Sequence, residues 1–396
     1  MDIKNLIRSY SEKYFNEVIY LRRHIHKNPE LSFMEFETSD FVASILKNYN
    51  IPFKKIAGTG IIGEIKGRGK GKTVALRAEL DALPVNEETG LSFSSSKPGI
   101  MHACGHDVHT ACLLGAAIIL KNIENKLKGR VLLLFQPGEE KLPGGAKKML
   151  EAGVFAEDHP SLIIAQHVLP ELPADTAGFK KGAYMASGDE IFLTIKGEGG
   201  HGALPDKTVN TVLIASKIIV ELEKIPLHLS PGVPTVLSFG KVKAEGATNV
   251  IPNRVDIEGT FRTMDEKWRN KAHKKIETIA GDIAKKMGGE CIVEINKGYP
   301  VLVNDPAYTE AGIKMLKDYL GEAQVKTLEK RMTTEDFAYF SLQYPVIFYR
   351  TGTGMPDKKL HSPFFDINEQ IIKPATGAMA WLAFNFCSCG QQYFKE

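Results

Sequence analysis

The sequence predicts a split α/β domain with a mostly parallel sheet, interrupted by an inserted ferredoxin-like domain. Three observations predict this fold class. Apolar runs without alternation, at 131–135 and 162–166, are typical of parallel strands that are buried on both faces. Helical patterns alternate with strands before residue 185 and again after residue 296. Between these positions the predicted order is β-α-β-β-α-β, which is the order of a ferredoxin-like module.

The elements before residue 185 follow from spacing and from turn residues. Apolar positions at helical spacing predict one helix over 2–27, which Pro29 ends. A second helix is predicted at 35–48, and β-rich runs predict strands at 60–65 and 73–78. The apolar segment 110–120 is predicted to be a buried helix. Strands at 131–135 and 162–166 then flank a short helix at 146–152.

The later elements complete the split domain. The inserted module is predicted from an alternating strand at 190–196, helices at 208–222 and 266–287, and strands at 235–242, 254–261 and 291–296. The segment 244–253 reads as a turn between two of these strands. A helix at 306–320, a strand at 346–349 and a helix at 374–386 resume the α/β pattern. The predicted domains are therefore 1–184, 185–296 and 297–396, with the first and last forming one domain.

Composition excludes several classes of protein. The chain has 396 residues, of which 43% are apolar and 24% charged, as is typical of globular proteins. Its net charge of +3 is too small for nucleic-acid binding driven by bulk charge. No apolar run approaches the ~18 residues of a membrane span, and we expect no signal peptide. Five cysteines in so long a chain predict a reducing, cytoplasmic setting without disulfides.

The densest chemical signal is the segment 101–109, which holds one thiol, three imidazoles and a carboxylate. Zinc and similar divalent ions favour cysteine sulfur and histidine nitrogen. Cys104 and His106 can reach one metal centre if the chain turns between them, and Gly105 permits that turn. The alternative is a buried cysteine beside surface histidines.

A second signal is the segment 136–140, directly after the buried strand at 131–135. Open α/β sheets place their sites at the carboxyl ends of strands. Because Glu139 and Glu140 are adjacent on a turn, one carboxylate can bind a metal while the other acts as a general base. The alternative is a solvated acidic turn.

Two further histidines could complete a metal site. His167 follows the strand at 162–165, and His361 lies behind the glycine-rich Thr351–Gly354. Each alone is more often a structural or surface residue. One zinc takes about four ligands, whereas five ligands and a bridging water fit two ions. The five candidates are Cys104, His106, Glu140, His167 and His361.

Two other residues are candidates for supporting roles. Asp81 follows the strand at 73–78 and could orient a metal ligand by hydrogen bonding, or it could be a cap or turn residue. His201 stands between glycines in the segment 197–205. It could donate a hydrogen bond to a developing oxyanion, or the segment could be a flexible loop.

These residues resemble the metal-dependent aminoacylase and carboxypeptidase family of metallopeptidases. Within that family they are similar to the amidohydrolase subfamily of hippurate hydrolases, N-acyl-amino-acid deacylases and auxin-conjugate hydrolases. The resemblance covers nearly the whole chain. It is carried by the segment 21–31, the Asp81 segment, the Cys104 cluster, the Glu139–Glu140 pair, His167, the His201 loop and the segments 334–337 and 361–366.

The resemblance implies roles for individual residues. Cys104, His106, Glu140, His167 and His361 match the family's metal ligands, which hold two divalent ions per subunit (Zn, Mn, Ni or Co). Glu139 matches the catalytic base, and His201 matches a lid histidine that reaches the partner subunit's site. Asn249 and Arg262 resemble lid residues that contact substrate. The inserted domain would then be a lid and dimerisation domain, in a homodimer or a tetramer.

The activity implied is hydrolysis of the amide bond of N-acyl amino acids or small peptides. N-acetyldiaminopimelate deacetylation and dipeptide hydrolysis are alternatives within the family. Glu79 and Gly138 depart from the residues usual there, Asp and Ala. A more distant alternative is a thiol hydrolase in which Cys104 attacks and His106 or His109 is the base. Another is a non-catalytic metal-binding protein, which has no need of a spare carboxylate beside Glu140.

Overall fold

The computed structural model describes residues 2–229 and 232–388, and the chain folds into two compact units. The first unit is the described part of Met1–Gly182, Val303–Glu329 and Tyr339–Glu396. The second is the described part of Ala183–Leu302 together with Lys330–Ala338. The first unit is therefore assembled from segments that precede and follow the second unit in the sequence.

Among the described residues, the first unit contains a sheet of eight strands in the order β1-β2-β4-β3-β5-β16-β6-β15. The four central strands run parallel, whereas β1, β2 and β6 each have an antiparallel neighbour. Residues 131–135 of β4 and all residues of β5 are buried, which confirms the prediction of two parallel strands covered on both faces. The strands are β1 (Phe53–Ile56), β2 (Gly60–Lys66), β3 (Thr73–Glu79), β4 (Arg130–Gln136), β5 (Leu162–Leu169), β6 (Ala177–Phe179), β15 (Val325–Thr327) and β16 (Val346–Gly352).

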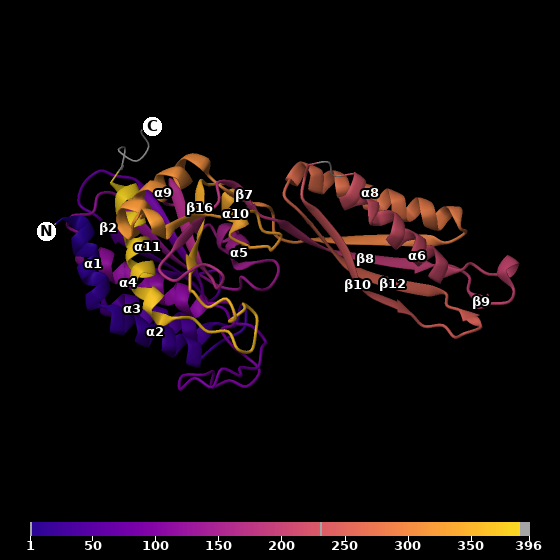
Figure 1. Cartoon of the computed structure of the whole chain (residues 1–396), viewed down its shortest axis with the longest axis horizontal. Coiled ribbons are helices and arrows are strands. Elements are labelled where there is room, and N and C mark those ends of the chain that lie inside the picture. The colour runs from indigo at the N-terminus through magenta and orange to yellow at the C-terminus, as the bar shows by residue number, and fades with distance from the viewer. Residues whose placement is uncertain (1, 230–231, 389–396) are drawn as a thin grey trace. The chain divides into compact units, whose positions relative to one another are not determined.

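Helices cover this sheet, as Figure 1 shows. Helix α4 packs on β3, and α11 packs on both β3 and α4, so these two helices form the layer next to the strands. Helix α2 packs against α4, and α9 packs against α11 and β16. The helices are α1 (Ile3–Lys13), α2 (Phe15–Lys27), α3 (Phe36–Asn48), α4 (His106–Asn122), α5 (Gly145–Glu151), α9 (Pro306–Leu320), α10 (Ala338–Ser341) and α11 (Ile372–Cys387).

The prediction of one helix over residues 2–27 was wrong, because the chain forms two helices there. Tyr14 separates α1 from α2 and takes φ −95° and ψ 2°, outside the helical region. Helix α1 packs on α11 and helix α2 packs on α4. The two helices therefore pack against different parts of the unit, and the spacing of apolar residues along the chain does not reveal this difference.

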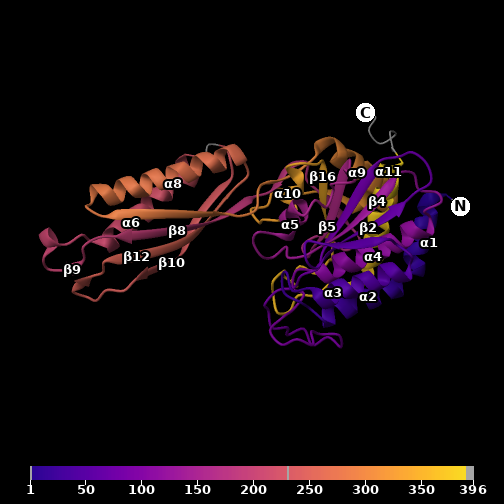
Figure 2. The same cartoon turned by 180° about the vertical axis from the view of Figure 1, so that it is seen from behind.

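The second unit is a four-stranded antiparallel sheet in the order β10-β12-β8-β13. Its elements follow the predicted β-α-β-β-α-β order, and this strand order confirms the ferredoxin-like module. Helices α6 and α8 lie on the same face, as Figure 2 shows, and residues of β8 alternate in burial accordingly. The elements are β8 (Ser187–Lys196), β9 (Gly200–His201), η1 (Pro205–Lys207), α6 (Thr211–Leu222), α7 (Lys224–His228), β10 (Thr235–Ala244), β11 (Val250–Ile251), β12 (Arg254–Thr263), α8 (Glu266–Lys286) and β13 (Glu290–Lys297).

The remaining elements are short. They are β7 (Gly182–Met185), β14 (Leu302–Asn304), η2 (Glu322–Gln324) and η3 (Glu369–Ile371). No helix in the described ranges combines the length and the apolar character needed to cross a lipid bilayer.

Candidate metal centre

The five predicted metal ligands all lie in the first unit, close to the carboxyl ends of its parallel strands. Glu140 follows β4, and Cys104 directly precedes Gly105 and helix α4. His361 lies in the loop between β16 and α11. His167 was expected after its strand but lies within β5, because the strand continues to Leu169 in register with β16. The carboxyl edge of a parallel sheet is where α/β proteins place their sites.

The donor atoms of these residues converge. Those of Cys104, His106 and His167 lie within 4.8 Å of one another, and so do those of Cys104, Glu140 and His361. Cys104 belongs to both groups of three, and together the groups contain all five predicted ligands. Two overlapping three-donor groups are an arrangement that can receive two cations.

Glu140 provides a direct test of whether the site fits a cation. Its Oε1 atom is buried and has no hydrogen-bond partner in the described part of the chain. The same atom lies 3.4 Å from His361 Nε2 and 3.9 Å from His106 Nε2. A buried oxygen without a hydrogen bond is costly, and a cation between the three atoms would satisfy it. The donor set therefore fits a metal.

The histidine rings are oriented by their other nitrogens. His106 Nδ1 lies 2.8 Å from the carbonyl oxygen of Asp81 and 3.2 Å from its carboxylate. His167 Nδ1 lies 2.7 Å from the carbonyl oxygen of Val168. Because an oxygen acceptor lies next to Nδ1 in each ring, Nδ1 carries the proton and the lone pair of Nε2 is available to bind a metal. Metal-binding histidines are usually oriented in this way. Asp81 also accepts a hydrogen bond from the Glu140 amide at 3.0 Å.

The thiol of Cys104 needs a cation to act as a thiolate ligand. Burial and the neighbouring Glu140 carboxylate raise the pKa of this thiol to about 12. A thiol with that pKa stays protonated at neutral pH unless a positive charge lies beside the sulfur.

His109 lies near the centre, but both its nitrogens are occupied. Nδ1 contacts Glu79 Oε2 at 2.8 Å, and Nε2 accepts the backbone N–H of Val168 at 2.9 Å. Although burial alone would raise it, Arg77 and His109 hold the pKa of the Glu79 carboxyl well below its usual range. His109 therefore orients the end of β5, next to His167. The sequence did not reveal this role, since it depends on a neighbouring strand.

The turn that carries the two glutamates is supported by a residue that the sequence did not single out. Glu35 is fully buried and accepts hydrogen bonds from the amides of Gly138 and Phe33, each at 2.8 Å. Gly138 has φ +50°, and an added Cβ would come within 2.2 Å of the Phe33 ring. This crowding explains why the chain has glycine at this position. Glu139 itself is buried, and its carboxylate lies in one cluster with the Glu140 carboxylate and the His106 imidazole.

The predicted lid residues lie in the second unit. His201 is exposed in β9 and pairs with Val250 of β11, within the segment predicted to be only a turn. The carbonyl oxygen of Asn249 accepts the amide of Gly202 at 2.8 Å, and Asn249 lies in the turn directly before β11, beside the strand that carries His201. Arg262 lies on β12 and donates to the carbonyl oxygen of Met332 at 2.9 Å.

The turn at Gly105 allows a prediction. Gly105 has φ +86°, as its place between Cys104 and His106 predicts, and an added Cβ would lie 2.5 Å from Val168 Cγ2. We expect Gly105→Ala to lower the free energy of unfolding by about 2–5 kcal/mol. Alanine is strained in the left-handed conformation, and its Cβ would also be packed too tightly against Val168. Urea unfolding measures this. Gly58→Ala is the matched control, because Gly58 has φ +87° with nothing within 4 Å. Equal losses in the two variants would exclude the packing contribution.

The chain is similar to known proteins both in sequence and in structure. The sequence model of a family described as peptidase family M20/M25/M40 matches residues 75–385. The N-acetyl-L-cysteine deacetylase of Bacillus subtilis is 39% identical over 364 residues, covering 91% of this chain and 86% of that protein. The N-acetyldiaminopimelate deacetylase of Lactobacillus helveticus is 35% identical, covering 93% and 97%. The crystal structure of the Bacillus subtilis YXEP protein, described as a dinuclear metal binding peptidase, superposes with a TM-score of 0.83 at 33% identity, covering 95% of this chain and 99% of that one.

Proposed function

This chain belongs to peptidase family M20/M25/M40, and we propose that it hydrolyses the amide bond of N-acyl amino acids with two divalent metal ions. The observation that carries the proposal is the convergence of five donor residues in two overlapping groups, in which Glu140 Oε1 has no hydrogen-bond partner among the described residues. Relatives that deacetylate N-acetyl-L-cysteine and N-acetyldiaminopimelate support an N-acyl amino acid as the substrate class.

The first unit would hold both ions. Cys104, His106 and His167 form one set of ligands, and Cys104, Glu140 and His361 form the other. Asp81 orients His106 and the Glu140 turn through its hydrogen bonds. Zn, Mn, Ni and Co all accept this mixture of sulfur, nitrogen and oxygen donors.

When bound, the ions would supply a Lewis acid and would lower the pKa of water. Glu139 removes a proton from the attacking water, whose oxygen bonds to the carbonyl carbon. Glu139 then gives that proton to the leaving nitrogen as the C–N bond breaks, which releases a carboxylic acid and an amino acid. Glu139 suits this role because its carboxylate lies beside Glu140 and His106, at the metal centre.

The inserted domain at residues 185–296, which lies within the second unit, would act as a lid and dimerisation domain. The exposed imidazole of His201 would donate a hydrogen bond to the oxyanion in the partner subunit's site. Asn249 and Arg262 would contact the substrate. We propose a homodimer through this unit. We also propose a cytoplasmic location, since Cys104, Cys112 and Cys291 are free thiols.

A substrate screen tests the proposal. The purified protein is incubated with N-acetyl and N-benzoyl amino acids, N-acetyldiaminopimelate and dipeptides, with added Mn²⁺ or Zn²⁺, and released amine is measured. We expect cleavage of N-acyl amino acids that EDTA abolishes and added metal restores.

Each alternative gives a different result. A thiol hydrolase would keep its activity in EDTA. A non-catalytic metal-binding protein would bind the ions and release no amine. Faster cleavage of N-acetyldiaminopimelate or of dipeptides than of the other substrates would replace the proposed substrate with that one.

A further inference from the structure

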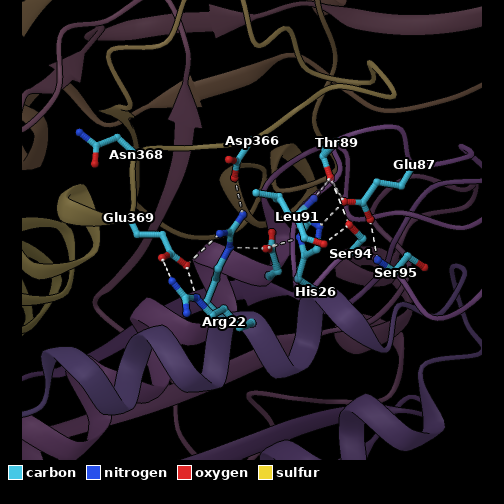
Figure 3. A network of polar contacts seen from close by, with 12 residues as sticks. Arg22, His26, Glu87, Thr89, Leu91, Ser94, Ser95, Asp366, Asn368 and Glu369 are labelled. Atoms are coloured by element: carbon cyan, nitrogen blue, oxygen red, sulfur yellow. Dashed lines mark hydrogen bonds and ion pairs between the residues drawn. The ribbon is translucent and has the colours of Figure 1, made fainter.

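The side chain of Arg22 lies fully buried in helix α2 and contacts carboxylates from two other parts of the first unit. Its Nε atom lies 2.8 Å from Asp107 Oδ2. Its Nη2 and Nη1 atoms lie 3.0 Å from Asp366 Oδ1 and 3.0 Å from Glu369 Oε1. Figure 3 shows the guanidinium between the side chains of Asp366 and Glu369. One cation thus joins three carboxylates, and the proposed mechanism uses none of these four residues.

Each end of this network adjoins a proposed metal ligand. Asp107 is the residue after His106, in the first turn of α4. Asp366 and Glu369 follow His361 in the segment that leads into α11. Arg22 therefore connects two segments that bring ligands to the centre from distant parts of the sequence.

His361 is the ligand that most needs such support. Its side chain is 55% exposed, so packing alone does not hold it in place. Its backbone has φ +62°, a conformation that non-glycine residues keep only where the surroundings impose it. The His361 amide donates to the carbonyl oxygen of Ala103 at 2.7 Å, which joins the same two segments beside the centre. The contacts of Arg22 with Asp107, Asp366 and Glu369 connect the Cys104–Asp107 segment to the segment after His361 a second time.

The network is anchored on its other side by His26. His26 Nδ1 lies 2.9 Å from the same Asp107 oxygen that Arg22 contacts, and His26 Nε2 lies 3.2 Å from Glu87 Oε1. Glu87 in turn accepts the amide of Ser95 at 2.7 Å. Arg22 and His26 are one helical turn apart, so α2 presents both to Asp107. The carboxylate beside His106 is therefore held from two directions.

We propose that Arg22 is a positioning residue that sets the spacing between the His106 turn and the His361 segment, and thereby the affinity of the centre for its cations. The inference rests on the proposed function, because it takes His106 and His361 as metal ligands. It assigns a role to the segment 21–31, which the sequence analysis singled out and the mechanism does not use. Partners behind metal ligands commonly change metal affinity about 10–100-fold when they are lost.

Three variants of the full-length protein test this. Asp366→Ala removes one of the two contacts between Arg22 and the segment after His361, and it leaves the Arg22–Glu369 contact and the buried Arg22–Asp107 pair intact. Arg22→Lys keeps the charge but cannot reach three carboxylates at once. Arg23→Gln is the matched control, because Arg23 is 47% exposed and contacts Glu369 but neither Asp107 nor Asp366. Zinc affinity is measured by competition with a chromogenic chelator, and thermal unfolding is measured on the metal-free proteins.

We expect Asp366→Ala and Arg22→Lys to bind zinc about 10–100-fold more weakly than the wild type, and Arg23→Gln to match the wild type. Metal-free Asp366→Ala should stay folded but should unfold at a lower temperature than metal-free Arg23→Gln, because the buried Arg22 guanidinium loses one carboxylate partner whereas Arg23 is partly exposed. Unchanged zinc affinity in Asp366→Ala and Arg22→Lys would overturn the inference. So would a metal-free Asp366→Ala protein that is unfolded, because the network would then hold the whole unit together. A wild-type protein that binds none of Zn²⁺, Mn²⁺, Ni²⁺ and Co²⁺ would instead refute the proposed function.

Discussion

Replacing Glu139 with glutamine is expected to lower kcat by about 10²–10⁴-fold, the usual contribution of a general base, while the metal content stays at the wild-type level. Glutamine keeps the shape of the side chain but cannot take a proton. Glu139 shares a cluster with Glu140 and His106, yet it lies outside the two groups that contain the five proposed ligands. Steady-state kinetics and elemental analysis of the same preparation provide the two measurements.

The adjacent residue supplies the control for this prediction. Glu140→Gln should lose metal together with activity, because Glu140 Oε1 is the buried oxygen that faces His106 and His361. If Glu139→Gln also lost its metal, Glu139 would be a ligand and another residue would have to be the base.

Replacing Cys104 with alanine is expected to remove both metals and all activity. Cys104 is the one proposed ligand common to both three-donor groups, so its loss weakens both. We expect affinity to fall by more than the ~10–100-fold that follows the loss of a partner behind a ligand. Metal content after dialysis against a weak chelator measures the effect.

Cys112→Ala is the matched control for this variant. Cys112 is buried on α4 like a core residue, and its sulfur lies 4.0 Å from the carbonyl oxygen of Ile372, away from the donor groups. This variant should keep its metal. Full occupancy in Cys104→Ala would refute the ligand role.

Much of the fold could be predicted from the sequence, because its signals are local. Strands β4 and β5 were identified because central parallel strands are apolar along their whole length. The ferredoxin-like module was identified from the order of its elements. Short edge strands such as β1 and β15 were missed, because a few residues with mixed burial carry too weak a pattern.

The candidate site was predictable as a set of residue types and less so as a set of contacts. Cys104 and His106 stood out because they are close in sequence, and Glu139 with Glu140 because they follow a buried strand. His109 lies in the same sequence segment as Cys104 and His106, but both its ring nitrogens are hydrogen-bonded, one to Glu79 and the other to the Val168 amide. Glu35 had no local signal, because its partner Gly138 is far away in the chain.

The sequence by itself determined the kinds of elements, their order and the inventory of sulfur, nitrogen and oxygen donors, since periodicity and turn chemistry act between residues a few positions apart. Only the tertiary structure decided which nitrogen of each histidine faces the centre and which carboxylate lies between His106 and His361. It also decided that Arg22 joins the segments behind these two ligands. These facts depend on hydrogen bonds and ion pairs between distant segments, whose geometry exists only once the sheet and its helices have packed.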